Sequence, residues 1–248
     1  MTLKGFGRTA AGLALALAAG CGDTSHPSAQ KDQARAGASL GESAADPRVF
    51  AAGSSPYGLP MKEWAYDWMR WVYSIPAATN PLIVAGVDYD QHQIGPVFFV
   101  PTGPNHDDAF TVSRHKALGV MLSQIQADFP CPDPAFRPAP GQSLFDFLST
   151  GLTTVNDGIT VLEVKLDGVP VQEPLRYRFT SSRLFFFVGD KSLAANFDAC
   201  VTGLLQPAVV DDLFLVFKPL PRGQHVLTTH IENIDGNVFD RTRTITSE

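Results

Sequence analysis

The alternation of apolar and polar positions divides the chain into one strong helix and a long series of strands. Between Met61 and Tyr73 the protein's three tryptophans recur with the i, i+4, i+7 spacing of one helical face, and Pro60 suits the start of that helix. A second, shorter helix is predicted from Leu144 to about Val155, with Ser143 as its N-cap. The remaining apolar runs have the length and the β-branched or aromatic content of strands. We predict strands at 97–100, 110–113, 118–124, 159–166, 169–171, 176–179, 184–188, 213–217, 225–232 and 238–245.

Turn residues separate these strands into hairpins and loops. Asp167-Gly168 is a strong short hairpin signal, and a second hairpin is predicted to turn at Asp235-Gly236-Asn237. Five prolines between residues 129 and 141 predict an extended loop there. The stretch from Asn196 to Leu205 is predicted as helix or loop, and Asp211-Asp212 is expected to end a loop before the buried strand at 213–217.

The last strand alternates charged and neutral positions. Its Arg241-Thr242-Arg243-Thr244-Ile245 run predicts an edge strand whose open backbone groups are shielded by charge. The whole pattern predicts a mainly β domain: a β-sandwich, of jelly-roll or immunoglobulin-like type, with one or two short helices packed on it.

Trp64, Trp68 and Trp71 share one face of the first predicted helix. We expect their indoles to dock that helix on a sheet, because large aromatic side chains dominate protein cores. The alternative is an aromatic platform that binds a sugar or a partner protein.

The first twenty residues have the pattern of an export signal. Lys4 and Arg8 precede an apolar run from Thr9 to Ala19, which is shorter than the roughly 20 residues needed to span a bilayer. The run closes on Leu17-Ala18-Ala19-Gly20-Cys21, which resembles the lipobox of bacterial lipoproteins, with Ala18 where the family usually has leucine. The resemblance implies cleavage by signal peptidase II before Cys21 and attachment of diacylglycerol to its sulfur.

The residues that follow Cys21 predict a flexible tether and the membrane to which the protein is anchored. Up to about Asp46 the chain is rich in Ser, Ala, Gly and Gln and has no aromatic residue, a composition typical of a flexible linker. Gly22, in place of an aspartate after the lipidated cysteine, favours the outer membrane over the inner membrane. We predict a cleaved signal at 1–20, a lipidated cysteine and tether at 21–46, and one β-sandwich-like domain at 47–248.

Short motifs in this domain resemble a group of exported bacterial proteins that has no assigned activity. The motifs are Trp68 and Trp71, Ser74-Ile75-Pro76, Asn80-Pro81, Gly95-Pro96-Val97-Phe98-Phe99 and, more weakly, Asp167-Gly168-Val169 and the run from Lys218 to His225. The resemblance implies one integral domain and identifies no functional site.

Charge and cysteine content narrow the classes of function. Removal of the signal changes the formal net charge from −6 to −8, so the protein has no electrostatic reason to bind nucleic acid or an anionic membrane surface. The mature chain has no glycine loop for phosphate, and we expect no cofactor. Cys131 and Cys200 remain after Cys21 is lipidated, and an even pair in an exported chain predicts a disulfide, with a metal or catalytic thiol as the alternative.

Two acidic segments carry the candidate metal or acid–base chemistry. Asp88, Asp90 and His92 alternate, so an extended backbone would turn all three side chains to one side, where calcium or zinc is the candidate ion. The second segment is His106-Asp107-Asp108 in a predicted loop. Because the two segments flank the strand at 97–100 from opposite ends, we expect separate sites unless the chain doubles back. The alternative for each is a solvated loop.

We find no catalytic signature in the mature chain and therefore predict a lipid-anchored, non-catalytic binding or interaction module of the cell envelope. Its partner is predicted to be an envelope protein or a glycan. The alternative is a periplasmic or surface hydrolase with a metal or carboxylate site among the residues of 88–92 and 106–108. A third hypothesis is a structural role in the envelope.

Overall fold

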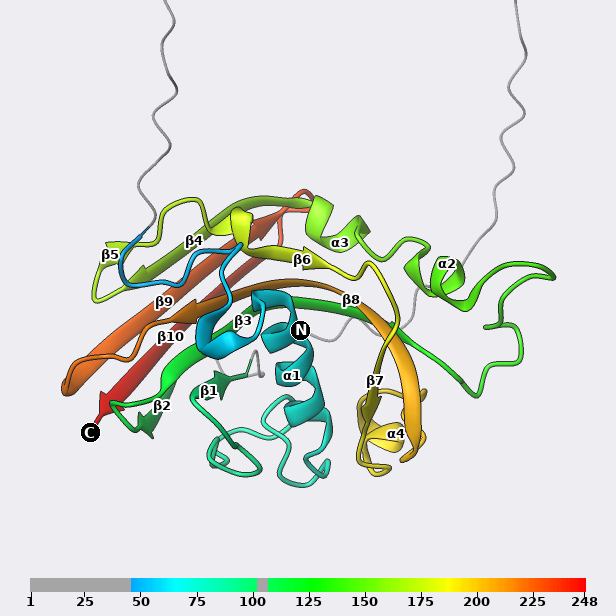
Figure 1. Cartoon of the computed structure of the whole chain (residues 1–248), viewed down its shortest axis with the longest axis horizontal. Helices are drawn as coiled ribbons and strands as arrows, with labels where there is room; N and C mark the ends of the chain where they lie inside the picture. The colour runs from blue at the N-terminus through cyan, green and yellow to red at the C-terminus, as the bar shows by residue number, and fades with distance from the viewer. Residues whose placement is uncertain (1–45, 102–106) are drawn as a thin grey trace, which may run out of the picture. The chain divides into compact units, whose positions relative to one another are not determined.

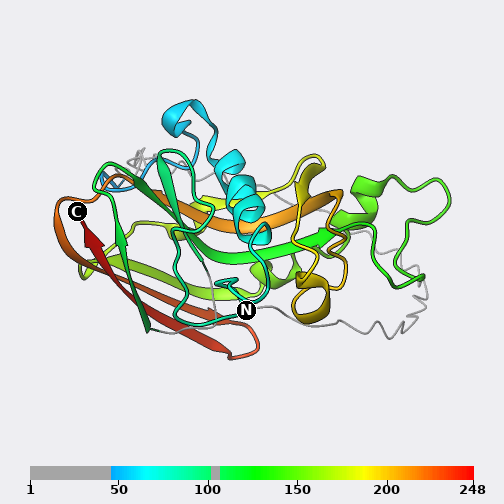
Figure 2. The ribbon, with the colours of Figure 1, turned by 90° about the horizontal axis from the view of Figure 1, so that it is seen from below.

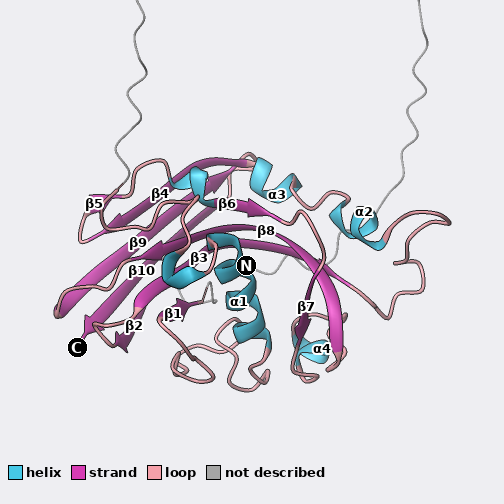
Figure 3. Ribbon diagram, viewed as in Figure 1, coloured by secondary structure: helices cyan, strands magenta, loops and turns pink. Residues whose placement is uncertain are grey.

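The computed structural model of the protein describes residues 46–101 and 107–248, with the backbone alone for Asp107. Strands are the main regular structure of the described residues and form two five-stranded sheets (Figures 1 and 3). The first sheet has the order β1 (Val97–Val100), β3 (Ala117–Asp128), β8 (Leu205–Phe217) and β6 (Arg178–Thr180), and β7 (Phe185–Val188) also pairs with β8. The second has the order β2 (Asp107–Val112), β10 (Val238–Ser247), β9 (Gly223–Asn233), β4 (Ile159–Leu166) and β5 (Val169–Pro170).

The two sheets pack against each other as a β-sandwich, which confirms the predicted fold class. Phe98 of β1 stacks on Phe110 of β2, with ring centroids 5.5 Å apart, and one apolar core joins residues of both sheets. Each sheet is mixed, because β1 pairs in parallel with β3, and β2 pairs in parallel with β10. The other strand pairs are antiparallel. Both parallel pairs therefore include an edge strand of their sheet.

Helix α1 (Met61–Tyr73) forms a third layer on the face of the first sheet that points away from the second sheet (Figure 2). Trp64, Trp68 and Trp71 are all buried beneath it. Each indole N–H donates to a backbone carbonyl at 2.9–3.0 Å, and these carbonyls belong to Pro56, Val100 and Gln91. The three tryptophans thus dock the helix and present no open face, so the aromatic platform is not formed.

The predicted second helix is divided into two. Helix α2 (Leu144–Ser149) begins where expected, because the Ser143 hydroxyl accepts from the Asp146 N–H at 3.1 Å. The chain then leaves the helical path through Gly151, whose φ of +75° lies in the region that favours glycine. Helix α3 (Thr154–Asp157) follows, and the remaining short helices of the described residues are η1 (Pro56–Gly58), η2 (Pro174–Tyr177) and α4 (Leu193–Asn196).

Asp211 and Asp212 lie in the middle of β8, so their placement in a loop was wrong. Both are fully buried, and strand alternation turns them to opposite faces of the sheet. Asp211 accepts hydrogen bonds from Arg178, Thr180 and Asn156 at 2.6–3.1 Å, so the carboxylate is paired. Neither oxygen of Asp212 has a hydrogen-bond partner, and burial, followed by the charge of Asp211, raises the pKa of Asp212 well above its usual range.

The disulfide joins Cys131 to Cys200, 69 residues apart, with their Cα atoms separated by 4.1 Å. On a chain-entropy model, closing a loop of this length stabilises the fold by about 4 kcal/mol. Disulfides persist in oxidising compartments, so this one indicates an exported protein. Within the described ranges, we find no helix that is both long and apolar enough to cross a bilayer.

A second pair of acids lies beside the disulfide. Asp128 is 3% exposed and accepts a hydrogen bond from Gln206, while Asp198 accepts one from Gln126 at 2.7 Å. Burial raises the pKa of Asp128 to about 8, and the neighbouring Asp198 adds to the rise. At neutral pH Asp128 is therefore protonated, which relieves the repulsion between the two carboxyl groups.

The Asp128 proton makes the folded protein less stable as the pH rises. Below the unfolded pKa of about 3.9, both states hold the proton, whereas up to about pH 8 the folded state alone holds it. The free energy of unfolding should thus fall by about 1.4 kcal/mol per pH unit across this window through Asp128. Urea unfolding at pH 5, 6 and 7 measures the slope of the unfolding free energy against pH. The contribution of Asp128 to this slope should be absent in Asp128→Asn and present in the exposed control Asp133→Asn. An unchanged slope in Asp128→Asn would contradict the assignment.

Candidate functional site

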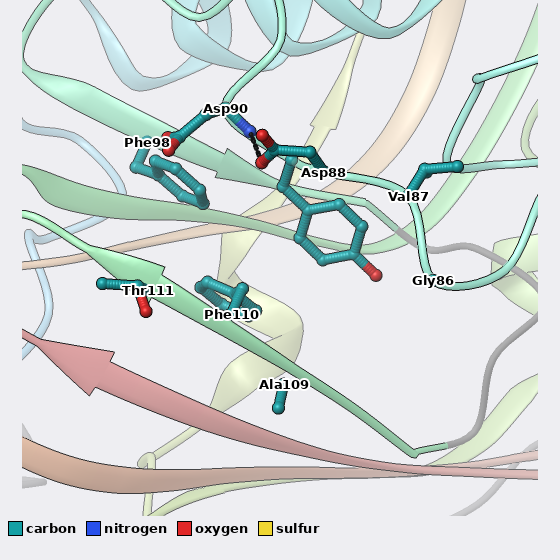
Figure 4. A pocket seen from close by; sticks show the side chains of 9 residues that line it. Gly86, Val87, Asp88, Asp90, Phe98, Ala109, Phe110 and Thr111 are labelled. Atoms are coloured by element: carbon teal, nitrogen blue, oxygen red, sulfur yellow. Dashed lines mark hydrogen bonds between the residues drawn. The ribbon is translucent and has the colours of Figure 1, made fainter.

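A cleft of about 350 Å³ lies at the side of the sandwich where the edge strands β1 and β2 meet (Figure 4). Its walls come from the segment 86–90, from β1 and from β2. The residues that line it are Gly86, Val87, Asp88, Tyr89, Asp90, Phe98, Ala109, Phe110 and Thr111. Such a volume is at the lower end of the range for ligand pockets, roughly 300–1,000 Å³.

The chain doubles back and brings the two acidic segments together here. The hydroxyl of Tyr89 donates a hydrogen bond to Oδ2 of Asp108, and the Tyr89 ring packs against Phe110 with centroids 5.4 Å apart. Tyr89 is buried, so it pins the segment 86–90 over β2. The expectation of two separate sites is thus corrected: Asp88, Asp90 and Asp108 lie on or just behind one cleft.

Asp108 is in turn paired with Arg243, which is 2% exposed between the sheets. Nε of Arg243 lies 3.3 Å from Oδ1 of Asp108, and its Nη2 donates to the carbonyl of Pro101 at 2.7 Å. The two residues stand opposite each other in the parallel register of β2 and β10. Burial, followed by the hydrogen bond to Asp108, raises the pKa of Tyr89, so its hydroxyl keeps the proton that it donates. Tyr89, Asp108 and Arg243 therefore form one chain of interactions behind the cleft.

The position of Arg243 corrects the prediction that the last strand is an edge strand. β10 lies between β2 and β9, and β2 covers the edge that was expected to be open. Arg241 and Arg243 point into the sandwich together with Ile245, which is fully buried. Burial, followed by the charge of Arg243, lowers the pKa of Arg241 to about 10, and Arg241 still carries its charge at neutral pH. Arg241, Arg243 and Ile245 are two residues apart, so they share one face of the strand. The apolar Ile245 was therefore the signal in the sequence that both arginines face inward.

The residues of the first predicted metal site do not share one direction. The segment is a series of turns and not an extended strand, because His92 has a φ of +59° and Oδ1 of Asp88 accepts from the Asp90 N–H at 2.8 Å. Asp88 and Asp90 line the cleft, whereas His92 does not and lies with Nδ1 3.2 Å from the Ser74 hydroxyl.

Parts of the predicted sites lie outside what the structure describes. These are His106 and the side chain of Asp107 in the second acidic segment, and Cys21, the predicted lipid-bearing residue. Of that segment, Asp108 alone has a described side chain, and it is committed to Tyr89 and Arg243.

Among the described residues, one group of three possible metal ligands has its ligand atoms within 4.8 Å of one another: Asp128, Asp198 and Cys200. The sulfur of Cys200 is bonded to Cys131 and has no thiolate to offer. At the cleft, the carboxylates of Asp88 and Asp90 are the oxygen ligands that a hard cation such as Ca²⁺ would use.

The chain matches no protein-family model, no curated protein and no solved structure.

Removal of the Tyr89 hydroxyl should destabilise the fold. Tyr89→Phe keeps the ring that packs on Phe110 but leaves an oxygen of Asp108 without its donor, which should cost about 1–3 kcal/mol. Tyr57→Phe is the control, because the ring of Tyr57 is half-exposed and its contacts with Phe50 and Trp64 do not involve the hydroxyl. Chemical denaturation of both variants measures the difference, and equal stabilities would mean that the hydroxyl of Tyr89 does not hold the segment 86–90.

Proposed function

We propose that the protein is a lipoprotein of the cell envelope whose β-sandwich is a non-catalytic binding module, with the cleft as its binding site. The observation that carries the proposal is the division of charge at the cleft. Asp88 and Asp90 are exposed at its rim, whereas three ionisable groups behind it, Tyr89, Asp108 and Arg243, are joined to one another. The two rim carboxylates are available to a ligand, whereas the groups behind the cleft bond to one another and fix its walls.

The predicted cellular location supports a role in the envelope. The disulfide between Cys131 and Cys200 agrees with export, and the lipobox resemblance implies a lipid on Cys21. Residue Gly22 favours the outer membrane, and the composition of residues 21–46 supports a flexible tether between the lipid and the domain. A tethered domain with a cleft at its edge suits capture of an envelope protein or a glycan.

The chemistry of the cleft favours binding over catalysis. A general base must be deprotonated and a nucleophile must be activated, usually by a neighbouring base. Tyr89 has a raised pKa and donates to Asp108, and Asp108 neutralises Arg243. Breaking this chain to release a catalytic group would leave the buried Arg243 uncompensated, which carries a large free-energy cost.

The second candidate function is a hydrolase with a metal site at the cleft. One observation favours it: Asp88 and Asp90 both line the same cleft. This candidate predicts that the purified protein retains a divalent cation, that a chelator lowers its melting temperature, and that one metal restores it. A non-catalytic module whose ligand is a macromolecule predicts no such response.

A long side chain at Ala109 should block the binding site. Ala109→Arg adds bulk and charge to the wall of the cleft, and Val169→Arg makes the same change of charge on β5, at the opposite end of the second sheet. The full-length lipidated protein is crosslinked in the living envelope, and the bound proteins and glycans are identified. We expect material that is bound by wild type and Val169→Arg but reduced at least tenfold in Ala109→Arg. Recovery of no envelope component, or equal recovery in both variants, would contradict the proposed binding site.

A further inference from the structure

We infer that the cleft binds an extended polypeptide segment, which pairs with the free edge of β2 through backbone hydrogen bonds and places a Lys or Arg side chain at Asp88 and Asp90. This inference rests on the proposed function and names the class of partner at the same site.

The backbone of β2 alternates between its partner strand and the cleft. The carbonyl of Val112 accepts from the N–H of Glu248 at 3.1 Å, and the N–H of Arg114 donates to the carbonyl of Glu248 at 2.8 Å, so both groups face β10. Along a strand, successive residues direct their N–H and C=O groups to opposite sides. The backbone groups of Ala109 and Thr111 therefore point away from β10, and both residues line the cleft. In the described part of the chain, β2 pairs with no strand other than β10.

The edge of β1 across the cleft is already closed by a side chain. The amide of Gln93 accepts from the N–H of Phe99 at 2.6 Å and donates to the carbonyl of Phe99 at 2.8 Å. One glutamine thus replaces a paired strand at Phe99. Val97, the other residue of β1 whose backbone groups point away from β3, is fully buried. This is the kind of protection that keeps an edge strand from pairing with another chain.

Other edges are also protected. β5 has two residues, one of them Pro170, and Arg48 donates to the carbonyls of Val169 and Pro170 at 3.1 and 2.9 Å. On β7, the carbonyl of Phe186 accepts from Arg70 of α1 at 3.0 Å. β2 has six residues, and in the described ranges no side chain or backbone group outside β10 bonds to Ala109 or Thr111. β2 thus lacks the protection that these edges have, and its unpaired residues line the cleft.

The cleft matches an extended strand with a basic side chain. Two free backbone positions separated by one residue have the repeat of about 6.6–6.8 Å that a paired strand requires. Ala109 contributes a small side chain to the wall, which leaves room for a second backbone, and the charged residues among those that line the cleft are Asp88 and Asp90. Because exposed ion pairs contribute little, about 0–1 kcal/mol, the acids select the partner and the backbone bonds provide most of the affinity.

The same features argue against a glycan as the occupant. Sugars bind to exposed faces of aromatic rings, and the ring of Phe98 is 1% exposed because it stacks on Phe110. Besides the two carboxylates, the wall offers the free backbone groups of a strand, whose alternating donors and acceptors complement another strand. Glycan binding is therefore an outcome that the experiment below must separate from strand pairing.

The test compares two substitutions of Thr111. Thr111→Pro removes an N–H on the free edge and no hydrogen bond to β10, a position where an edge strand tolerates proline, whereas Thr111→Val keeps the N–H. A phage-displayed library of linear twelve-residue peptides is selected on the full-length protein, and the enriched peptides are synthesised. We expect peptides that alternate β-formers with Lys or Arg. Their Kd should be equal for wild type and Thr111→Val. For Thr111→Pro the Kd should be about threefold to tenfold higher.

A second measurement leaves the protein unchanged. The peptide nitrogens are methylated at alternate positions, in one peptide at the odd residues and in another at the even residues. One of the two peptides should lose binding and the other should keep it, because only one side of the bound strand pairs with β2. Asp88→Asn and Asp90→Asn should reduce both the affinity and its dependence on salt. Failure to enrich any peptide, equal binding by Thr111→Pro and Thr111→Val, or insensitivity to both methylation registers would overturn strand pairing.

Failure of this inference can be told apart from failure of the proposed function. If envelope material is bound by wild type, lost in Ala109→Arg and unaffected in Thr111→Pro, the cleft is a binding site for a ligand other than a strand. If Ala109→Arg has no effect, the cleft is not the site, and both the proposed binding site and the strand pairing are overturned.

Discussion

A guanidinium group buried between two β-sheets determines the arrangement of this molecule at its open side. A buried charge is stable when it is paired and hydrogen-bonded, and Arg243 meets this need with Asp108 and the carbonyl of Pro101. These partners belong to β2 and to the end of β1, so one side chain of β10 fixes the register of its neighbour and the position of the strand across the sandwich. Tyr89 bonds the same carboxylate, and the segment 86–90 is thereby held over β2. The cleft is the space that this set of contacts leaves.

The long strands of the first sheet also bury ionisable side chains, at places away from the cleft. β8 runs past the end of the second sheet, and α3 covers the inner face of its continuation. At that boundary Asp211 is paired with Arg178, whereas Asp212 on the other face has no hydrogen-bond partner and burial raises its pKa well above its usual range. Burial likewise raises the pKa of Asp128, at the end of β3, beside the disulfide. The buried carboxyl groups thus differ in their surroundings, because Asp211 alone among these three has a cationic partner.

The sequence predicts the elements whose signals are local. The limits of α1 follow from the spacing of its tryptophans, the hairpin at Asp167-Gly168 from its turn residues, and the disulfide from the even count of cysteines in an exported chain. The errors concern contacts between distant segments. The run of Arg241 and Arg243 has the alternation of an exposed strand, and its burial depends on β2, which pairs with it from more than a hundred residues away. The doubling back that joins Tyr89 to Asp108 likewise has no local signal. Of the three residues predicted to share one side of an extended segment, Asp88 and Asp90 line the cleft and His92 does not, because the segment turns and the cleft results from tertiary contacts.

Amide hydrogen exchange of the free full-length protein measures directly whether the edge of β2 is open while the edge of β1 is bonded to Gln93. We expect strong protection for the amides of Phe110 and Val112, which face β10, and for the amide of Phe99, which is bonded to Gln93. We expect little protection for the amides of Ala109 and Thr111. If Ala109 and Thr111 are protected to the same degree as their neighbours in β2, another part of the molecule already covers this edge, and the cleft is not a free binding site.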